Sequence, residues 1–74
     1  MTEEAVYRIE VQGMIGPRWE AWFEGLALRV RDGDDGTPIT TLTGVVADQS
    51  ALRGVLAKLW DLNLTLLSVT RIVS

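Results

Sequence analysis

The acidic run Asp-Gly-Asp-Asp-Gly at residues 32–36 brings three carboxylates close together, and carboxylates are the side chains that most often bind calcium. An EF-hand loop needs oxygen ligands at its first, third and fifth positions, glycine at the sixth and glutamate at the twelfth. Counted from Asp32, the fifth position is Gly36 and the twelfth is Thr43, so the spacing fails. Glycine and aspartate at this density are typical of a hairpin turn, which we favour over a metal site.

Side chains suited to catalysis are scarce. The chain has no histidine and no cysteine, which removes the commonest general base and all thiol chemistry. An enzyme would have to use Asp, Glu, Lys, Tyr or Ser, and no pair of these stands at a usable spacing. We therefore expect no catalytic residue, no metal and no cofactor. Asp48 and Gln49 remain as candidate polar contacts to a ligand.

Length and composition indicate one small globular domain spanning residues 1–74. Hydrophobic residues make up 47% of the chain, too many for a disordered protein, yet no apolar run is long enough to cross a bilayer. The acidic start Met-Thr-Glu-Glu is unlike a signal peptide, so we expect a cytoplasmic protein without a membrane partner. A net charge of -3 argues against binding to phosphate backbones.

A helix is predicted over residues 49–62. Asp48 can accept hydrogen bonds from the first turn, and Asn63 suits a left-handed residue after the last turn. Leu64 should then fold back on Leu59, as in a Schellman ending. The apolar positions recur at spacings of three and four, which is the pattern of a helix lying on a core: Leu52, Val55, Leu56, Leu59 and Leu62.

Four segments have strand character: residues 7–11 and 26–30, which alternate apolar and polar residues, and the β-rich residues 39–47 and 64–73. Gly44 inside one of them indicates a bulge or a close approach by another group. Residues 13–25 hold Trp19, Trp22 and Phe23 on one face of a short helix. They serve either as an aromatic platform or, as we favour, as a plug for the core.

The order β, short α, β, β, α, β predicts an α+β, ferredoxin-like βαββαβ fold, with a four-stranded antiparallel sheet and both helices on one face. The first and third strands should lie in the centre, and residues 26–46 should form a hairpin. If residues 13–25 are only a long loop, the alternative is a ββ-meander followed by a βαβ unit with a single helix.

The exposed face of this sheet should carry three arginines and no aromatic residue, so we expect a solvated or partner-facing surface and no nucleic acid. Its expected members are Arg8, Glu10, Gln12, Arg29, Arg31, Thr41 and Thr43.

The last strand does not resolve into a buried and an exposed face. Leu64, Leu66 and Ile72 alternate with residues that include Leu67 and Val69, so either register leaves bulky apolar side chains away from the helix. An apolar strand at the edge of a sheet invites pairing with another chain, and we expect a homo-oligomer that covers it.

Trp60 flanks the apolar stripe within reach of Arg53, so a cation–π contact could form there. Trp60 serves either as a binding hot spot or, as we slightly favour, as a cap on the edge of the core. Gly54 lies on the outer side of the helix, where a second subunit could approach closely. The candidate interaction surface therefore comprises Trp60, Arg53, Gly54, Leu66, Ser68, Trp19 and Trp22.

Residues 42–69 resemble a group of short bacterial hypothetical proteins with the shared pattern T-x-L-x-G-x-x-x-D-Q-x-x-L-x-G-x-L-x-x-L-x-x-L-G-L-x-L, whose positions this chain matches from Thr40 to Leu66. Asn63 replaces the glycine of that pattern, which still fits a left-handed cap. No activity is established for that group, so the resemblance implies an element order and no catalytic residue.

Two functions are compatible with these features. The first is a small non-enzymatic interaction module, homo-oligomeric and binding a protein partner. The alternative is an ACT-like regulatory domain that binds a small molecule at its subunit interface, near residues 13–16 and 48–49, an idea that rests on fold analogy alone.

Overall fold

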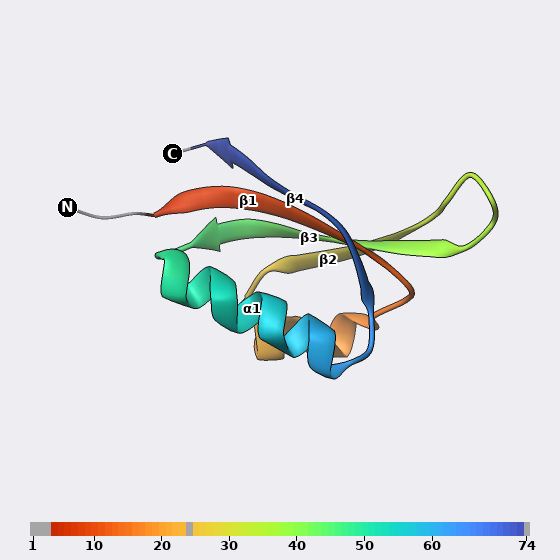
Figure 1. Ribbon diagram of the computed structural model, residues 1–74, viewed down its shortest axis with the longest axis horizontal. Helices are drawn as coiled ribbons and strands as arrows, with labels where there is room; N and C mark the ends of the chain where they lie inside the picture. The colour runs from red at the N-terminus through yellow and green to blue at the C-terminus, as the bar shows by residue number, and fades with distance from the viewer. Residues whose placement is uncertain (1–3, 24, 74) are drawn as a thin grey trace.

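The computed structural model describes residues 4–23 and 25–73, so Glu3 of the acidic start lies outside the described residues. Within the described part, four strands, one α-helix and one 3-10 helix follow one another (Figure 1). They are β1 (Ala5–Gln12), η1 (Pro17–Phe23), β2 (Ala27–Asp32), β3 (Pro38–Val46), α1 (Gln49–Asp61) and β4 (Thr65–Val73).

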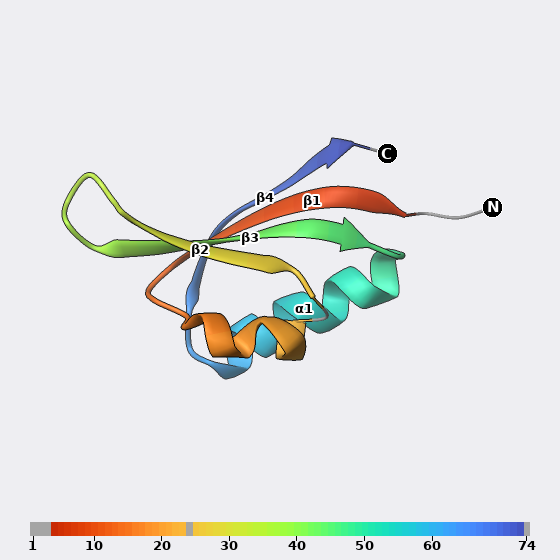
Figure 2. The ribbon, with the colours of Figure 1, turned by 180° about the vertical axis from the view of Figure 1, so that it is seen from behind.

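The strands form one antiparallel sheet in the order β2-β3-β1-β4, which confirms the expected central pair and the expected hairpin. Because β1 pairs with β3 and β4, and β2 pairs with β3 alone, the meander of the alternative is wrong, whereas its single α-helix is present. Both η1 and α1 lie on the same side of the sheet (Figures 1 and 2). The fold is nevertheless not a full ferredoxin-like βαββαβ unit, because the first crossover holds a 3-10 helix instead of an α-helix.

The short first crossover follows from its boundaries. Pro17 begins η1, and Gly25 ends the segment with φ of +82°, a conformation that glycine adopts at little cost. Between these limits η1 spans seven residues. The Glu20 carboxylate accepts a hydrogen bond from the Leu28 N–H at 3.2 Å, which fastens η1 to β2.

Both ends of α1 are capped as the sequence predicts. The Asp48 carboxylate accepts a hydrogen bond from the Ala51 N–H at 2.8 Å. Asn63 has φ of +62°, and its N–H donates to the Trp60 carbonyl while the Leu64 N–H donates to the Leu59 carbonyl. This pair of bonds is the Schellman ending.

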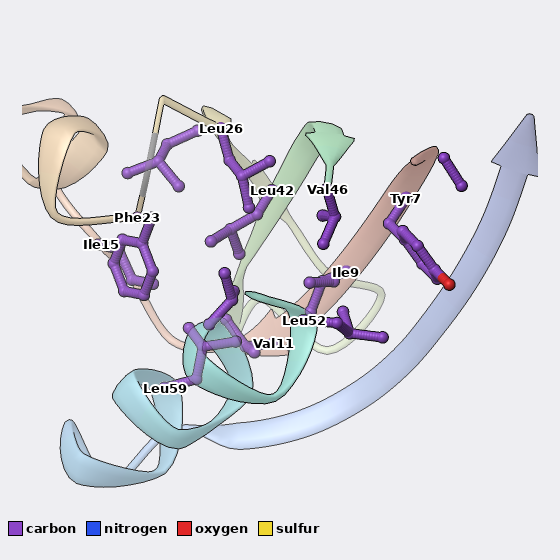
Figure 3. Packing of buried hydrophobic residues seen from close by; sticks show 13 residues of the cluster. Tyr7, Ile9, Val11, Ile15, Phe23, Leu26, Leu42, Val46, Leu52 and Leu59 are labelled. Carbon is purple, nitrogen blue, oxygen red and sulfur yellow. The ribbon is translucent and has the colours of Figure 1, made fainter. Parts of the chain in front are cut away.

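The core lies between the sheet and the two helical segments (Figure 3). Ile9, Leu42 and Phe23 are fully buried in it, so Phe23 plugs the end of the core as expected. Thr40 is also fully buried, and its hydroxyl donates to the Gly13 carbonyl and accepts from the Ile15 N–H. That hydroxyl therefore holds the turn between β1 and η1.

Gly44 marks a close approach, one of the two explanations that the sequence left open. A Cβ atom at this position would lie 2.8 Å from Leu26 Cδ2. Leu26 is itself buried, so its side chain has little freedom to move aside. The missing side chain of Gly44 thus makes room for Leu26 against the sheet.

Two register shifts in β4 explain why neither alternation of its sequence fits. Glu10 pairs with Ser68 and Val11 with Leu66, so Leu67 has no opposite residue. Ile72 likewise has no opposite residue, because Tyr7 pairs with Arg71 and Val6 with Val73. Each extra residue reverses the alternation, as β-bulges do. The helix-side face therefore takes Leu66, Val69 and Arg71, and the outer face takes Ser68 and Thr70.

Candidate interaction surface

The acidic run at residues 32–36 forms the β2–β3 turn, as expected. The Gly36 N–H donates to the Gly33 carbonyl at 3.0 Å, and Gly36 has φ of +84°. The Asp35 carboxylate accepts the Thr37 N–H at 2.9 Å, and this bond lowers the pKa of Asp35 below its usual value. Among the described residues, no group of three or more His, Cys, Asp or Glu side chains is arranged to hold a metal ion.

Asp48 and Gln49 both have partners within the chain. Asp48 caps α1, as described above. The Gln49 amide donates to the Tyr7 hydroxyl at 3.0 Å, which ties the start of α1 to the central strand β1. These two bonds account structurally for both polar residues.

Around Glu10, the outer face of the sheet is polar. Its carboxylate accepts hydrogen bonds from Arg31 at 3.1 Å, from Ser68 at 3.3 Å and from Thr41 at 3.5 Å. The Arg31 hydrogen bond is the main cause that lowers the pKa of Glu10. The other expected members of this face are exposed or half-buried on β1, β2 and β3: Arg8, Gln12, Arg29 and Thr43.

The aromatic residues of η1 divide between core and surface. Trp19 packs partly against the core, whereas Trp22 is exposed beside the Phe23 ring. Lys58 of α1 lies over Trp22, with its ammonium 5.6 Å from the ring centroid and 2.6 Å from the Trp22 carbonyl oxygen. Trp22 therefore belongs to the contact between η1 and α1.

A groove of about 400 Å³ runs along one flank of α1. Its lining residues are Gln49, Leu52, Arg53, Leu56 and Trp60, which fall at helical spacings of three and four. The Trp60 side chain is 55% exposed. The Arg53–Trp60 cation–π contact considered from the sequence does not form, because among the described residues such contacts join only Arg18 to Trp19 and Lys58 to Trp22.

Gly54 lies away from this groove. A Cβ atom built on it would meet no other atom within 4 Å. Open space therefore remains beside Gly54, on the side of α1 where the sequence suggested a close approach.

β4 forms one edge of the sheet and carries apolar side chains on it. Leu67, Val69 and Ile72 are exposed, and Val69 is 38% exposed although its cross-strand neighbour Ile9 is fully buried. The helix α1 therefore leaves the helix-side face of β4 partly uncovered. Leu66 is half-buried against the core, and the Ser68 hydroxyl is turned to Glu10 on the outer face.

The groove on α1 and the helix-side face of β4 lie on the same side of the sheet. Gln49, at one end of the groove, is bonded to Tyr7, and Tyr7 pairs with Arg71 of β4. In Figure 3, Leu52 and Tyr7 both point toward the side on which β4 passes. We call this combined region the α1/β4 surface, made of Leu52, Arg53, Leu56, Trp60, Leu67, Val69 and Ile72.

Sequence comparison places most of the chain in a known family. Residues 6–70 match the model of a domain of unknown function, DUF8691. The chain is a member of the DUF8691 family. The matched region begins in β1 and ends in β4, so it includes part of all four strands, both helical segments and the α1/β4 surface except Ile72. No curated protein and no solved structure matches the chain.

Sequence reasoning found Trp60, Arg53 and the apolar side chains of β4, but it did not place Leu52 and Leu56 on the α1/β4 surface. Leu52 and Leu56 were assigned to the core stripe, although they also line the groove. A signal was present, since Arg53, Leu56 and Trp60 are spaced by three and four and form a second stripe beside the first. Within the described chain, none of the helices is both long and apolar enough to cross a membrane.

Proposed function

We propose that this DUF8691 domain is a small non-enzymatic interaction module that assembles with copies of itself through the α1/β4 surface. The observation that carries the proposal is the edge of β4, where Leu67, Val69 and Ile72 stand exposed beside an apolar helix groove. An unpaired strand edge offers backbone N–H and C=O groups to a second strand, and apolar side chains add favourable burial.

Self-association would also stabilise a domain whose own core is small. A chain of 74 residues buries a modest core, and burial of the α1/β4 surface would enlarge it. A binding role for protein suits this surface better than a small-molecule role. Asp48 and Gln49, the polar groups that an ACT-like site would use, already have partners within the chain.

The test is the solution mass, measured by light scattering on a size-exclusion column over a dilution series. We expect a mass that falls from oligomer to monomer as the protein is diluted. A monomer at every concentration, up to the millimolar range, would overturn the proposal.

A matched pair of variants locates the surface. Val69→Lys should weaken self-association about tenfold or more, because an interface that buries an unpaired ammonium loses more than about 1.4 kcal/mol. Val45→Lys is the control, since Val45 is 55% exposed on β3 and outside the α1/β4 surface. If both substitutions weaken self-association equally, β4 does not lie in the interface.

A further inference from the structure

The edge of β4 suits a two-fold partner of its own kind. Antiparallel pairing of a strand with its own copy is isologous, so the same residues serve both subunits. The shape of the uncovered surface gives this arrangement further support. Val69 faces the helix side of the sheet yet remains 38% exposed, so an apolar strip above β4 lacks a cover in the single chain.

Resting on the proposed self-association, we infer that β4 pairs antiparallel with β4 of a second copy about a two-fold axis within residues 67–69. The two sheets then continue as one, and the two α1 helices lie on the same face. Each groove faces the other across the paired strands. Trp60 and Leu56 of both copies fill the trough whose floor is Val69.

The position of the axis follows from strand length and charge. β4 spans residues 65–73, so pairing centred near residue 69 engages the largest part of the strand. Arg71 is the charged residue of this strand. An axis within residues 67–69 places Arg71 opposite residues 63–67 of the second copy and keeps the two Arg71 side chains apart. A two-fold axis at Arg71 would bring like charges together, which is unfavourable.

The size of the surface is that of a weak, transient contact. A strand of nine residues is about 30 Å long, and the strip that combines its edge with a helix flank is about 15 Å wide. Two such strips bury roughly 900 Å² in total, close to the lower limit of about 1,000 Å² for a specific interface. We therefore expect a dimer in the micromolar range that dissociates on dilution.

Cysteine cross-linking tests the arrangement directly, because the chain contains no cysteine of its own. Single substitutions Leu67→Cys, Val69→Cys and Arg71→Cys sample β4, and Val45→Cys is the control. Val45 is more exposed than Val69, so random collisions would cross-link it at least as readily. We expect Val69→Cys or Leu67→Cys to form a covalent dimer under mild oxidation, at least about ten times faster than Val45→Cys, because residues at a two-fold axis lie about 5 Å apart.

The outcomes separate this geometry from the proposed function. If light scattering finds an oligomer while residues 67 and 69 fail to cross-link above the control, or while Arg71→Cys cross-links faster than both, the geometry is overturned and the interaction module stands. If light scattering finds only monomer, both are overturned.

The helix part of the interface has its own matched pair. Trp60→Ala should raise the dimer dissociation constant about tenfold, as buried aromatic residues at interfaces often do. Trp22→Ala is the control, because Trp22 is also exposed but contacts Lys58 on the opposite flank of α1. Equal dissociation constants for these two variants would show that the trough between the two α1 helices is not part of the dimer interface.

Discussion

Arg31 on β2 donates a hydrogen bond to Glu10 on β1 at 3.1 Å, although β3 lies between these strands. The arginine side chain spans β3 on the outer face, where Thr41 of β3 also donates to Glu10. Ser68 of β4 completes the set. One carboxylate thus receives donors from the other three strands of the described sheet.

Glu10→Gln should lower the free energy of unfolding by about 0.5–1 kcal/mol at neutral pH, the range of a partly exposed ion pair. Because the folded state lowers the pKa of Glu10 from its usual 4.5, its contribution is present above that value. The contribution is lost as the pH falls through the lowered, folded-state pKa. Urea unfolding at pH 7 and pH 3 measures the change.

The control for this substitution is Asp34→Asn in the exposed β2–β3 turn. The difference in the free energy of unfolding between wild type and Glu10→Gln should be smaller at pH 3 than at pH 7. The free energy of unfolding of Asp34→Asn should equal that of wild type at both pH values. A difference in the free energy of unfolding that does not decrease between pH 7 and pH 3 would mean that shape, and not charge, sets the role of Glu10.

Gly44→Ala should destabilise the domain by about 1–3 kcal/mol, because its new methyl group would meet the buried Leu26 side chain. Gly54→Ala should act in the opposite direction and add up to about 1 kcal/mol, since alanine is the better helix former and the site has open space. Thermal unfolding of both variants makes the comparison. Equal stability of Gly44→Ala and wild type would show that Leu26 can repack.

Asp48→Ala should cost about 1 kcal/mol of stability, because the Ala51 N–H at the start of α1 then loses its acceptor. Asp48→Ser keeps a side-chain oxygen at the cap and should retain most of the stability. The midpoint of urea unfolding distinguishes them. A Ser variant as unstable as the Ala variant would contradict the capping role.

Asn63→Ala should cost about 1 kcal/mol, since φ of +62° is strained for a residue with a Cβ atom and without the local hydrogen bonding of asparagine. Asn63→Gly should equal or exceed wild type in melting temperature, because glycine adopts this conformation freely. A lower melting temperature for Asn63→Gly than for Asn63→Ala would rule out backbone strain as the reason.

Local signals in the sequence predicted local structure well. Asp48 and Asn63 mark the ends of α1 because each acts on backbone groups only a few residues away. The strand order was also accessible, since alternation and turn residues define the hairpin and its neighbours. The length of η1 was less accessible, because the spacing of Trp19, Trp22 and Phe23 does not distinguish an α-helix from a 3-10 helix.

The two faces of β4 could not be predicted from its residues. The bulges at Leu67 and Ile72 arise from pairing with β1, a strand that lies far away in the sequence. Simple alternation assigns Leu66 and Val69 to opposite faces, and only the unpaired Leu67 brings them to the same one. The α1/β4 surface depends on that shift. The sequence therefore indicated that the edge strand is apolar, but not which of its side chains share a face.

The position of β1 in the sheet has a consequence for protein synthesis. Both neighbours of β1, β3 and β4, are made after it, and Val6 pairs with Val73. During translation, β1 therefore leaves the ribosome long before its last partner exists. Pairing at such separations in sequence is slow, because a large loop must close before any contact forms. We expect the complete sheet to form only after residue 73 has emerged. Until then, β1 lacks its partner β4.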